Sequence, residues 1–306
     1  MVELRPTVCH TALQVVMEAT LSKPKSTFFS PAEKLALAKL LTDDDPEIHR
    51  MIRSEIVSRG REAAEWMSSF SLSNDPVLRR RSQEIVRHFD RQTADNDFLA
   101  FCLKNGEDLD LEHGCWLLSR TRYPEAQIEG YRALIDSFAG ALLDIIDFGA
   151  EPEGMLADIN QFLYSREQFQ GCNREKFDPA DCYLSQVIND RKGGDIALGL
   201  IYLFICQRLN LPVVGIGMPG HFLCRFQTLR DETYIDPYHK GRLLTKNACV
   251  RFLRETGRRY DERFLAPMSP RQALLRICSN LHQCYVQQSL PEERDRLQRY
   301  VIALSK

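Results

Sequence analysis

Apolar residues in the first 95 or so positions recur with helical spacing, and two of the segments that they form begin alike. Asp45-Pro46 and Asp75-Pro76 each place an aspartate before a proline, and these residue types favour the N-cap and the first turn of a helix. Pro46 and Pro76 lie 30 residues apart, and a further helical segment precedes each of them. We therefore predict a repeat of paired helices in residues 1–95, with a plain helical bundle as the alternative.

One later segment is apolar on nearly every side. Ile196–Cys206 lacks a polar face, which is typical of a helix buried in the middle of a domain. Asp195 precedes it as the expected N-cap, and Pro212 ends it. The two short runs that follow, residues 213–217 and 221–226, have the β-branched and aromatic residues of strands. We expect a central helix that packs against a small sheet.

Helical patterns surround this core on both sides. They run from residue 96 to residue 166 and return in two segments that begin at Pro270 and Pro291. An irregular stretch rich in Gly, Asn and Pro leads into a short helix that is expected to begin at Cys182. The expected fold class is α+β, with a mostly helical N-terminal region, a buried helix against a small antiparallel sheet, and a C-terminal helical pair. The expected domains are 1–95, 96–266 and 267–306.

The composition is that of an ordinary globular protein. Forty basic and 42 acidic residues give a formal net charge of −2, so no overall field attracts nucleic acid or anionic lipid. Arg79-Arg80-Arg81 is interpreted as a solvated helix face. The first ten residues lack the features of a signal peptide, and Ile196–Cys206 is too short to span a bilayer. We expect a cytoplasmic protein that binds neither membranes nor nucleic acid directly.

The ten cysteines are scattered, and no two of them form a Cys-x-x-Cys pair. A zinc ribbon or a redox motif therefore has no support. Most of the cysteines have apolar neighbours, among which a reduced thiol behaves as a small hydrophobic residue. The pattern predicts no cofactor and no dedicated metal site.

Three residues around the central helix stand in the order of a nucleophilic triad. Asp195 opens the helix, His221 begins the second strand, and Asp236 lies in the strand after it. Papain-like and transglutaminase-like enzymes carry Cys, His and an acidic residue in this order. In this chain Asp195 takes the place of the thiol.

Three segments resemble the SirB-type family within the transglutaminase-like superfamily: LNLPVVGIGMPGHFLCRF, YIDPYHKGRLL and FDPADCYLSQVINDRKGGDI. The resemblance covers about residues 60–306, and Pro219-Gly220-His221-Phe222 and Asp236-Pro237 are its most specific parts. It implies a helical N-terminal region, a transglutaminase-like core and a tetratricopeptide-like helical tail. The 30-residue repeat near the N-terminus additionally resembles HEAT-type repeats.

The resemblance implies that His221 is the triad histidine and that Asp236 orients it. Because Asp195 stands where active relatives have cysteine, we do not expect cysteine-dependent acyl transfer. Asp195 is either an N-cap worth about 1 kcal/mol or part of an Asp195-His221-Asp236 cluster that holds a metal ion or acts as a general base. Cys182 is the alternative nucleophile if a helix N-terminus activates it, and a small buried thiol otherwise. His239 either lines the same cleft or is exposed in a loop.

Three classes of function fit these patterns. The first is a non-catalytic pseudoenzyme that acts as a binding or regulatory scaffold for a protein or peptide partner. The second is a hydrolase or acyl transferase that uses Cys182 with His221 and Asp236, or the Asp-His-Asp cluster. The third is a regulator that meets nucleic acid only through other proteins. We predict the first, with a groove around Asp195 and His221 that favours a cationic group.

Overall fold

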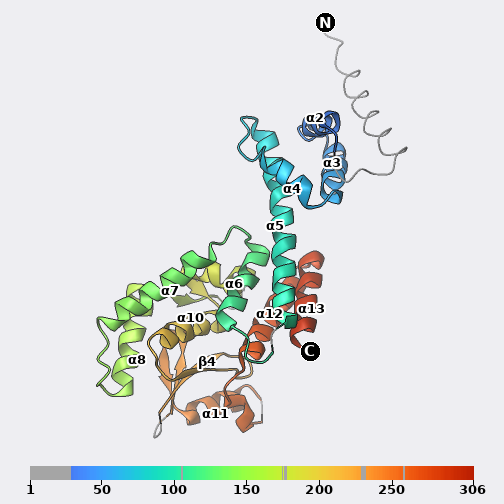
Figure 1. Cartoon of the computed structure of the whole chain (residues 1–306). Coiled ribbons are helices and arrows are strands. Elements are labelled where there is room, and N and C mark those ends of the chain that lie inside the picture. Colours follow the sequence, from blue (N-terminus) through green and yellow to red (C-terminus); the bar gives the residue numbers. More distant parts are fainter. Residues whose placement is uncertain (1–28, 105, 174, 176–177, 229–231, 258) are drawn as a thin grey trace. The chain divides into compact units, whose positions relative to one another are not determined.

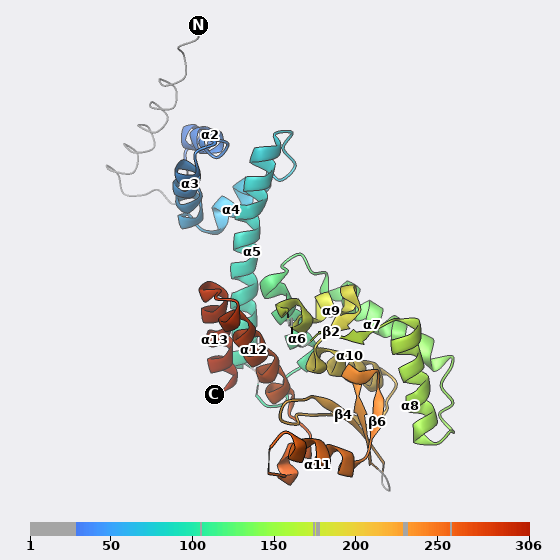
Figure 2. The same cartoon turned by 180° about the vertical axis from the view of Figure 1, so that it is seen from behind.

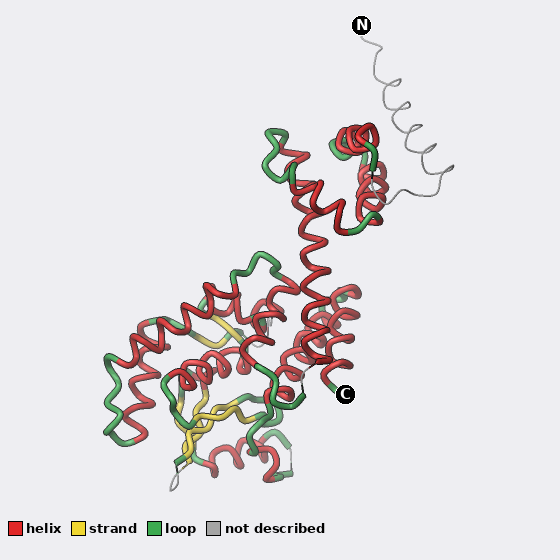
Figure 3. The backbone as a smooth tube through the Cα atoms, in the orientation of Figure 1, coloured by secondary structure: helices red, strands yellow, loops and turns green. Residues whose placement is uncertain are grey.

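The computed structural model describes residues 29–104, 106–173, 175, 178–228, 232–257 and 259–306 of the 306-residue chain. The chain divides into two compact units, one up to Thr93 and one from Ala94 to Lys306. Each unit has a hydrophobic core of its own. Helices predominate in both, and the described strands all belong to the second unit (Figure 3).

The first unit consists of helices α2 (Pro31–Leu40), α3 (Pro46–Ser58), α4 (Arg61–Ser68) and the beginning of α5 (Pro76–Lys104). Asp45 and Asp75 accept hydrogen bonds from backbone N–H groups in the first turns of α3 and α5. Apolar side chains of both helices meet in one buried cluster, among them Ile52 and Ile85. The predicted helix starts at Pro46 and Pro76 are confirmed, while the grouping into HEAT-like repeats stays a prediction.

The second unit is built around helix α10 (Asp195–Arg208), whose residues from Ile196 to Cys206 are all buried. The prediction of a central apolar helix is therefore confirmed. The other helices of the unit are α6 (Leu111–Arg122), α7 (Ile128–Leu143), α8 (Pro152–Asn160), α9 (Leu184–Asp190), α11 (Lys246–Glu255), α12 (Pro270–Gln287) and α13 (Pro291–Leu304). Shorter helical segments are η1 (Gln161–Arg166), η3 (Pro179–Cys182), η4 (Pro237–His239) and η5 (Glu262–Leu265).

Four strands form an antiparallel sheet in the order β3-β4-β5-β6, with the bounds Val213–Ile216, Leu223–Gln227, Glu232–Asp236 and Arg242–Leu244. Successive residues of a strand face opposite sides of a sheet. Cys224 and Ile235 accordingly pack in the core around α10, whereas Leu223 and Tyr234 pack with residues of α11. The sheet lies between α10 and α11 in Figure 1 and in the reverse view of Figure 2. The α+β fold class is confirmed.

Two elements beside this sheet carry too few residues for a sequence pattern to reveal them. Strands β1 (Gln170–Gly171) and β2 (Lys192–Gly193) pair in parallel, two residues each.

At the C-terminus, α12 contacts α13 and also packs on α6, η3 and α10. The helical pair is therefore part of the second unit, and its tetratricopeptide-like character stays a prediction.

Three element boundaries differ from the expectations. Cys182 is the last residue of η3, and α9 begins only at Leu184, so Cys182 is not in the first turn of that helix. Gly194, rather than Asp195, is the N-cap residue of α10. His221 lies two residues before β4 instead of within it. Gly and Pro turns interrupt the chain at these points, and apolar periodicity locates such boundaries only to within a few residues.

Two glycines make room for the ring of Phe222. A Cβ atom on Gly199 of α10 would lie 2.3 Å from Cδ1 of Phe222, and one on Gly215 of β3 would lie 2.8 Å from Cζ. Both distances are below van der Waals contact, so helix and strand close on the ring from two sides. Because His221 precedes Phe222, this packing restricts where the histidine lies.

We expect Gly199→Ala to lower the free energy of unfolding by about 1–3 kcal/mol, because the added methyl group overpacks the core against Phe222. Gly140 in α7 is the matched control, since a Cβ atom there would have no neighbour within 4 Å. Gly140→Ala should leave stability unchanged or raise it by up to about 1 kcal/mol through helix propensity. Urea unfolding followed by circular dichroism measures both, and equal effects of the two substitutions would contradict the packing.

Candidate functional site

A tight turn before β4 holds His221 in place. Gly220 has a φ angle of 81°, in the left-handed region that favours glycine. The backbone N–H of His221 donates to the carbonyl oxygen of Met218 at 3.0 Å, and Nη1 of Arg276 on α12 donates to the same oxygen at 3.1 Å. The side chain of His221 is only 4% exposed. The turn therefore holds the imidazole of His221 in a buried position.

The imidazole of His221 lies between two carboxylates. Its Nε2 is 2.8 Å from Oδ1 of Asp236, and its Nδ1 is 3.5 Å from Oδ2 of Asp195. Asp195 is the first residue of α10, and Asp236 is the last residue of β5. The expected contact between His221 and Asp236 is confirmed, and the three residues that share a triad order in the sequence meet in space. Their part in catalysis stays a prediction.

Both carboxylate oxygens of Asp195 accept hydrogen bonds from the backbone. Oδ1 accepts from the N–H of Ile196 at 2.9 Å, and Oδ2 accepts from the N–H of Phe222 at 2.6 Å. Nη2 of Arg276 lies 3.7 Å from Oδ2. Asp195 is therefore more than a local cap, because it ties the start of α10 to the segment that enters β4. Sequence reasoning missed Arg276, which lies far along the chain in an ordinary helical pattern.

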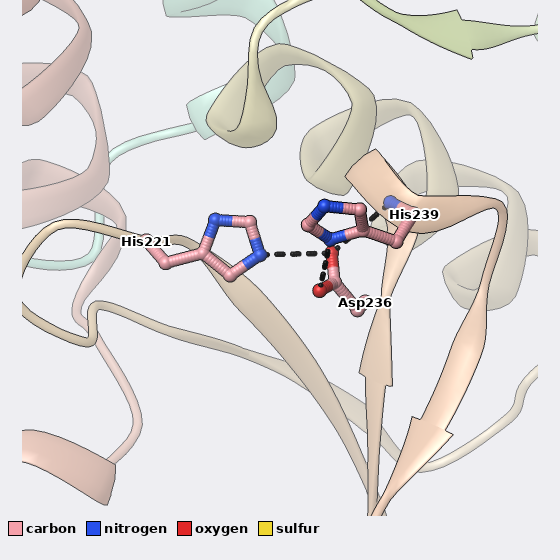
Figure 4. A group of neighbouring side chains, drawn as sticks. All are labelled: His221, Asp236 and His239. Atoms are coloured by element: carbon pink, nitrogen blue, oxygen red, sulfur yellow. Dashed lines mark hydrogen bonds and ion pairs between the residues drawn. The ribbon is translucent and has the colours of Figure 1, made fainter. Parts of the chain in front are cut away.

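Asp236 also holds His239, which belongs to η4. Nδ1 of His239 is 2.7 Å from Oδ2 of Asp236, and the backbone N–H of His239 donates to Oδ1 at 3.2 Å. Figure 4 shows the rings of His221 and His239 on either side of the Asp236 carboxylate. The side chain of His239 is 57% exposed, so the histidine borders the cleft and reaches solvent.

The side chains of His221, Asp236 and His239 form a group with the donor set of a metal site. One ligand atom from each lies within 4.8 Å of the others. Two imidazoles and one carboxylate suit several divalent transition metals. Asp195 is outside this group, so the cluster differs in composition from the Asp195-His221-Asp236 set that the sequence suggests.

Burial and hydrogen bonding act in opposite directions on these groups. Burial alone would lower the pKa of His221, but its close contacts with the carboxylates of Asp195 and Asp236 outweigh this effect and raise the pKa above its ordinary value. Burial alone would raise the pKa of each carboxyl group, but hydrogen bonds with His221 and neighbouring cations lower it. The two carboxylates therefore favour the protonated form of the imidazole more than water does. A protonated imidazole has no lone pair with which to accept a proton as a general base.

Cys182 lacks the properties of a replacement nucleophile. It is 1% exposed, and burial raises the pKa of its thiol well above the ordinary value. It lies at the end of η3 rather than in the first turn of α9. All nine cysteines in the described part of the chain are buried. A reactive thiolate needs exposure and a lowered pKa, so Cys182 fits the simpler interpretation of a small buried thiol.

A cavity of about 450 Å³ opens beside His221, and we call it the α11 cavity. His221, Asp236 and His239 line its polar end, where Arg242 of β6 joins them, and Phe252 of α11 contributes to an apolar wall. Sequence reasoning did not predict that residues of β6 and α11 line a cavity with His221. These residues follow Asp236 in the chain, and their patterns are those of an ordinary strand and an ordinary amphipathic helix.

The α11 cavity also contains a thiol that sequence reasoning overlooked. Cys249 lines it from the first turn of α11. Burial, followed by the negative charge of Asp236, raises the pKa of Cys249 to about 11. At neutral pH the group is therefore a neutral thiol and a poor nucleophile. The one signal in the sequence is the spacing of Cys249 and Leu253, which marks the buried face of the helix.

Residues 129–279 match the sequence model of the transglutaminase-like superfamily. The chain contains a transglutaminase-like domain. The matched range includes Asp195, His221 and Asp236. The matched range begins in α7 and ends in α12.

Similar proteins occur in bacteria and in mammals. A UPF0162 protein of Xylella fastidiosa (strain Temecula1) is 31% identical over 189 residues, which cover 58% of this chain and 66% of that protein. A UPF0162 protein of Pseudomonas aeruginosa is 31% identical over 130 residues, or 41% of this chain and 47% of that protein. F-box only protein 21 of Mus musculus is 27% identical over 135 residues, or 42% of this chain and 21% of that protein.

The transglutaminase-like chain spans just under two thirds of the length of the Xylella relative. No solved structure matches it. Among the residues that the structure describes, none of the helices combines the length and the apolar character that a membrane crossing requires.

The pKa of His221 predicts a definite pH dependence of stability. Its folded-state pKa is raised, so its contribution is complete below the unfolded-state value of about 6.5 and is lost as the pH rises through the folded-state value. The lowered pKa values of Asp195 and Asp236 act in the acid range, where stability is lost as the pH falls below about 4. Between pH 5.5 and 8.5 the wild type should therefore lose more stability than His221→Gln.

Urea unfolding at several pH values measures this difference. The substitution leaves the other titrating groups in place, including His49, whose pKa is lowered chiefly by burial and therefore acts with the opposite sign. A direct NMR titration of His221 in the wild type serves if the variant folds poorly. A His221 pKa at or below about 6.5 would contradict this prediction.

Proposed function

We propose that this transglutaminase-like protein is non-catalytic and binds a segment of a protein or peptide partner in the α11 cavity. The observation that carries the proposal is the state of Asp195. At the place of the superfamily nucleophile stands a carboxylate whose two oxygens accept backbone hydrogen bonds and whose charge faces Arg276. In this proposal, Asp195 positions His221 and the start of β4.

The chemical requirements of acyl transfer also support this proposal. That mechanism needs a thiolate at the helix start and donors that stabilise an oxyanion. Asp195 places negative charge where the oxyanion would form, and it occupies the backbone N–H groups of Ile196 and Phe222. Asp195 and Asp236 raise the pKa of His221, so these carboxylates favour the protonated form of the imidazole over the neutral form that accepts a proton from a nucleophile.

The α11 cavity has the features of a small binding pocket: a polar end, an apolar wall and a volume of about 450 Å³. Among the described residues, no ion pair engages Arg242, which lines the polar end. Arg251 also lines the cavity, at 3.9 Å from Glu255. Asp236 and Glu255 line the cavity as well, so the preference for an acidic group that is attached to an apolar chain rests on Arg242.

This preference replaces the expectation of a cationic ligand. That expectation assumed an uncompensated charge on Asp195, but Arg276 and His221 both lie within 4 Å of its Oδ2. The side chain of Asp195 is 17% exposed and does not line the α11 cavity. The occupant that the cavity favours is therefore an acidic side chain or a peptide carboxylate.

In the proposed role the protein is a cytoplasmic scaffold or regulator that meets nucleic acid, if at all, through its partner. The stretch shared with F-box only protein 21 makes up 21% of that longer protein.

A second candidate is metal-dependent or general-base chemistry at His221, Asp236 and His239, which the clustering of their ligand atoms favours. It requires a neutral His221, because a metal ion and a proton compete for Nε2. Repeating the NMR titration with Zn²⁺ separates the two functions. A lowered apparent pKa of His221 with saturable Zn²⁺ binding supports the metal site, and an unchanged titration supports the binding module.

Labelling with an electrophilic glutamine-containing peptide tests the absence of thiol catalysis. The wild type should give no adduct that depends on His221, whereas Asp195→Cys should react through its new thiol. At pH 6.5 that reaction should be about tenfold or more faster than in the double variant Asp195→Cys/His221→Gln, because an imidazolium and a helix N-terminus lower the pKa of a thiol. Peptide mass spectrometry locates the adducts.

Labelling of the wild-type protein distinguishes a non-catalytic protein from an enzyme that uses a cysteine. An adduct on Cys182 or Cys249 that disappears in His221→Ala would overturn the non-catalytic proposal and make the protein an acyl-transfer enzyme or hydrolase. Circular dichroism of each variant checks that the loss of reactivity is not a loss of folding.

Peptide binding tests the α11 cavity. Short fluorescent peptides with a glutamate between leucines should bind more tightly than the same peptides with glutamine. Arg242→Gln should weaken the glutamate peptides by about tenfold or more, since a hydrogen bond to a charged group contributes about 1.5–3 kcal/mol. Arg254→Gln is the matched control, because Arg254 is an exposed residue of α11 that does not line the cavity.

Fluorescence anisotropy measures these affinities. Equal weakening by Arg242→Gln and Arg254→Gln would indicate unspecific attraction and contradict a defined pocket. Equal affinity for the glutamate and glutamine peptides would contradict the preference for an acidic group.

A further inference from the structure

A second cavity lies within the first unit, between α3 and α5, far from the triad residues in the sequence. Its volume is about 540 Å³. His49, Arg50 and Arg53 line it from α3, and Glu84, Arg87 and Arg91 line it from α5. We call it the basic groove. All of its lining residues belong to the unit that ends at Thr93.

Helical geometry explains why these side chains converge. On α3 the lining positions 46, 49, 50 and 53 follow the spacing i, i+3, i+4, i+7, and on α5 the positions 84, 87, 88 and 91 follow the same spacing. Such positions share one face of a helix. Beneath them Ile52 and Ile85 join the same buried cluster, so the core of the unit holds the two basic faces together.

The groove carries a large excess of positive charge. Of the residues that the structure describes, four arginines and one glutamate line it, which gives a net charge of +3 with neutral histidines. The single acid, Glu84, lies 4.0 Å from Nε of Arg80 on its own helix. Among the described residues, no ion pair or hydrogen bond engages the guanidinium groups of Arg50, Arg53 and Arg87.

His49 adds an unsatisfied polar atom to this charge. Its Nε2 is buried and has no hydrogen-bond partner among the described residues. Burial lowers the pKa of His49, and the charge of Arg81 lowers it further. A neutral imidazole can donate one hydrogen bond, so His49 adds a polar group to the lining of arginines.

From this geometry we infer that the basic groove binds a compact ligand with two phosphate groups. Planar guanidinium groups match phosphate oxygens in pairs, which is why arginine predominates in phosphate recognition. One phosphomonoester carries about −2 charge at neutral pH, less than the +3 of the groove, so a diphosphate matches the charge better.

Nucleic acid fits the groove less well than a small diphosphate does. Proteins that bind single strands stack bases on aromatic rings, and no Phe, Tyr or Trp of the described part of the chain lines this groove. The cavity volume is that of a small-molecule site, and a duplex needs a longer basic surface. The inference concerns the first unit and is independent of the function proposed for the α11 cavity.

Calorimetric titration of the full chain with pyrophosphate, in a buffer without phosphate, tests the inference. We expect binding of one pyrophosphate per chain that weakens as salt is added. Arg53→Gln and Arg87→Gln should each weaken it about tenfold or more. Arg53→Lys keeps the charge but not the planar fork, so it should fall between the wild type and Arg53→Gln.

Arg61→Gln removes the same charge from an exposed residue of α4 outside the groove and should leave the affinity unchanged. Orthophosphate should bind more weakly than pyrophosphate. Equal affinities of these two anions, equal effects of all the substitutions, or no binding at all would each overturn the inference. So would a DNA duplex that displaces pyrophosphate and depends on Arg79 and Arg80 more than on Arg53 and Arg87.

Discussion

The hydrogen bond from the backbone N–H of Phe222 to the carboxylate of Asp195 is the constraint on which the site depends. At 2.6 Å it joins the first residue of α10 to the segment that enters β4. The ring of the same phenylalanine fills the space that Gly199 and Gly215 leave open. Backbone and side chain of Phe222 are thus both fixed, and the preceding residue, His221, has little freedom to lie elsewhere. A charged acceptor strengthens such a bond relative to a neutral one.

The buried charges around this bond balance one another. Asp195 and Asp236 supply two negative charges, Arg276 supplies one positive charge, and His221 supplies a second one when it is protonated. Removing one member of such a group leaves an uncompensated buried charge, which costs more than the pair itself contributes. A thiol in place of Asp195 would leave Arg276 and protonated His221 with one carboxylate fewer. The carboxylate therefore suits a stable, closed arrangement, whereas a thiol suits a reactive one.

How far the sequence could predict this site follows from the kind of signal that each part carries. The central helix was predictable because eleven successive apolar residues leave no polar face, and the meeting of His221 with Asp236 because their order matches a triad. The turn that places His221 before β4, and the start of α9 after Cys182, depend on backbone angles that periodicity does not encode. Arg276 and Cys249 join the site only through tertiary packing, so their local patterns resemble those of any helix.

The two cavities show why net charge is a poor guide to binding. Over the whole chain 40 basic and 42 acidic residues nearly cancel, which argues against attraction of anions at long range. At short range, the periodicity of the α-helix places charged residues on particular faces. The arginines of α3 and α5 lie on the faces that border the basic groove. Recognition of an anion depends on the groups within a few ångströms of it, because salt screens exposed charges beyond about 8 Å at physiological ionic strength. A chain with almost no net charge can therefore carry a strongly basic site, and the arrangement of its helices, rather than its composition, decides where that site is.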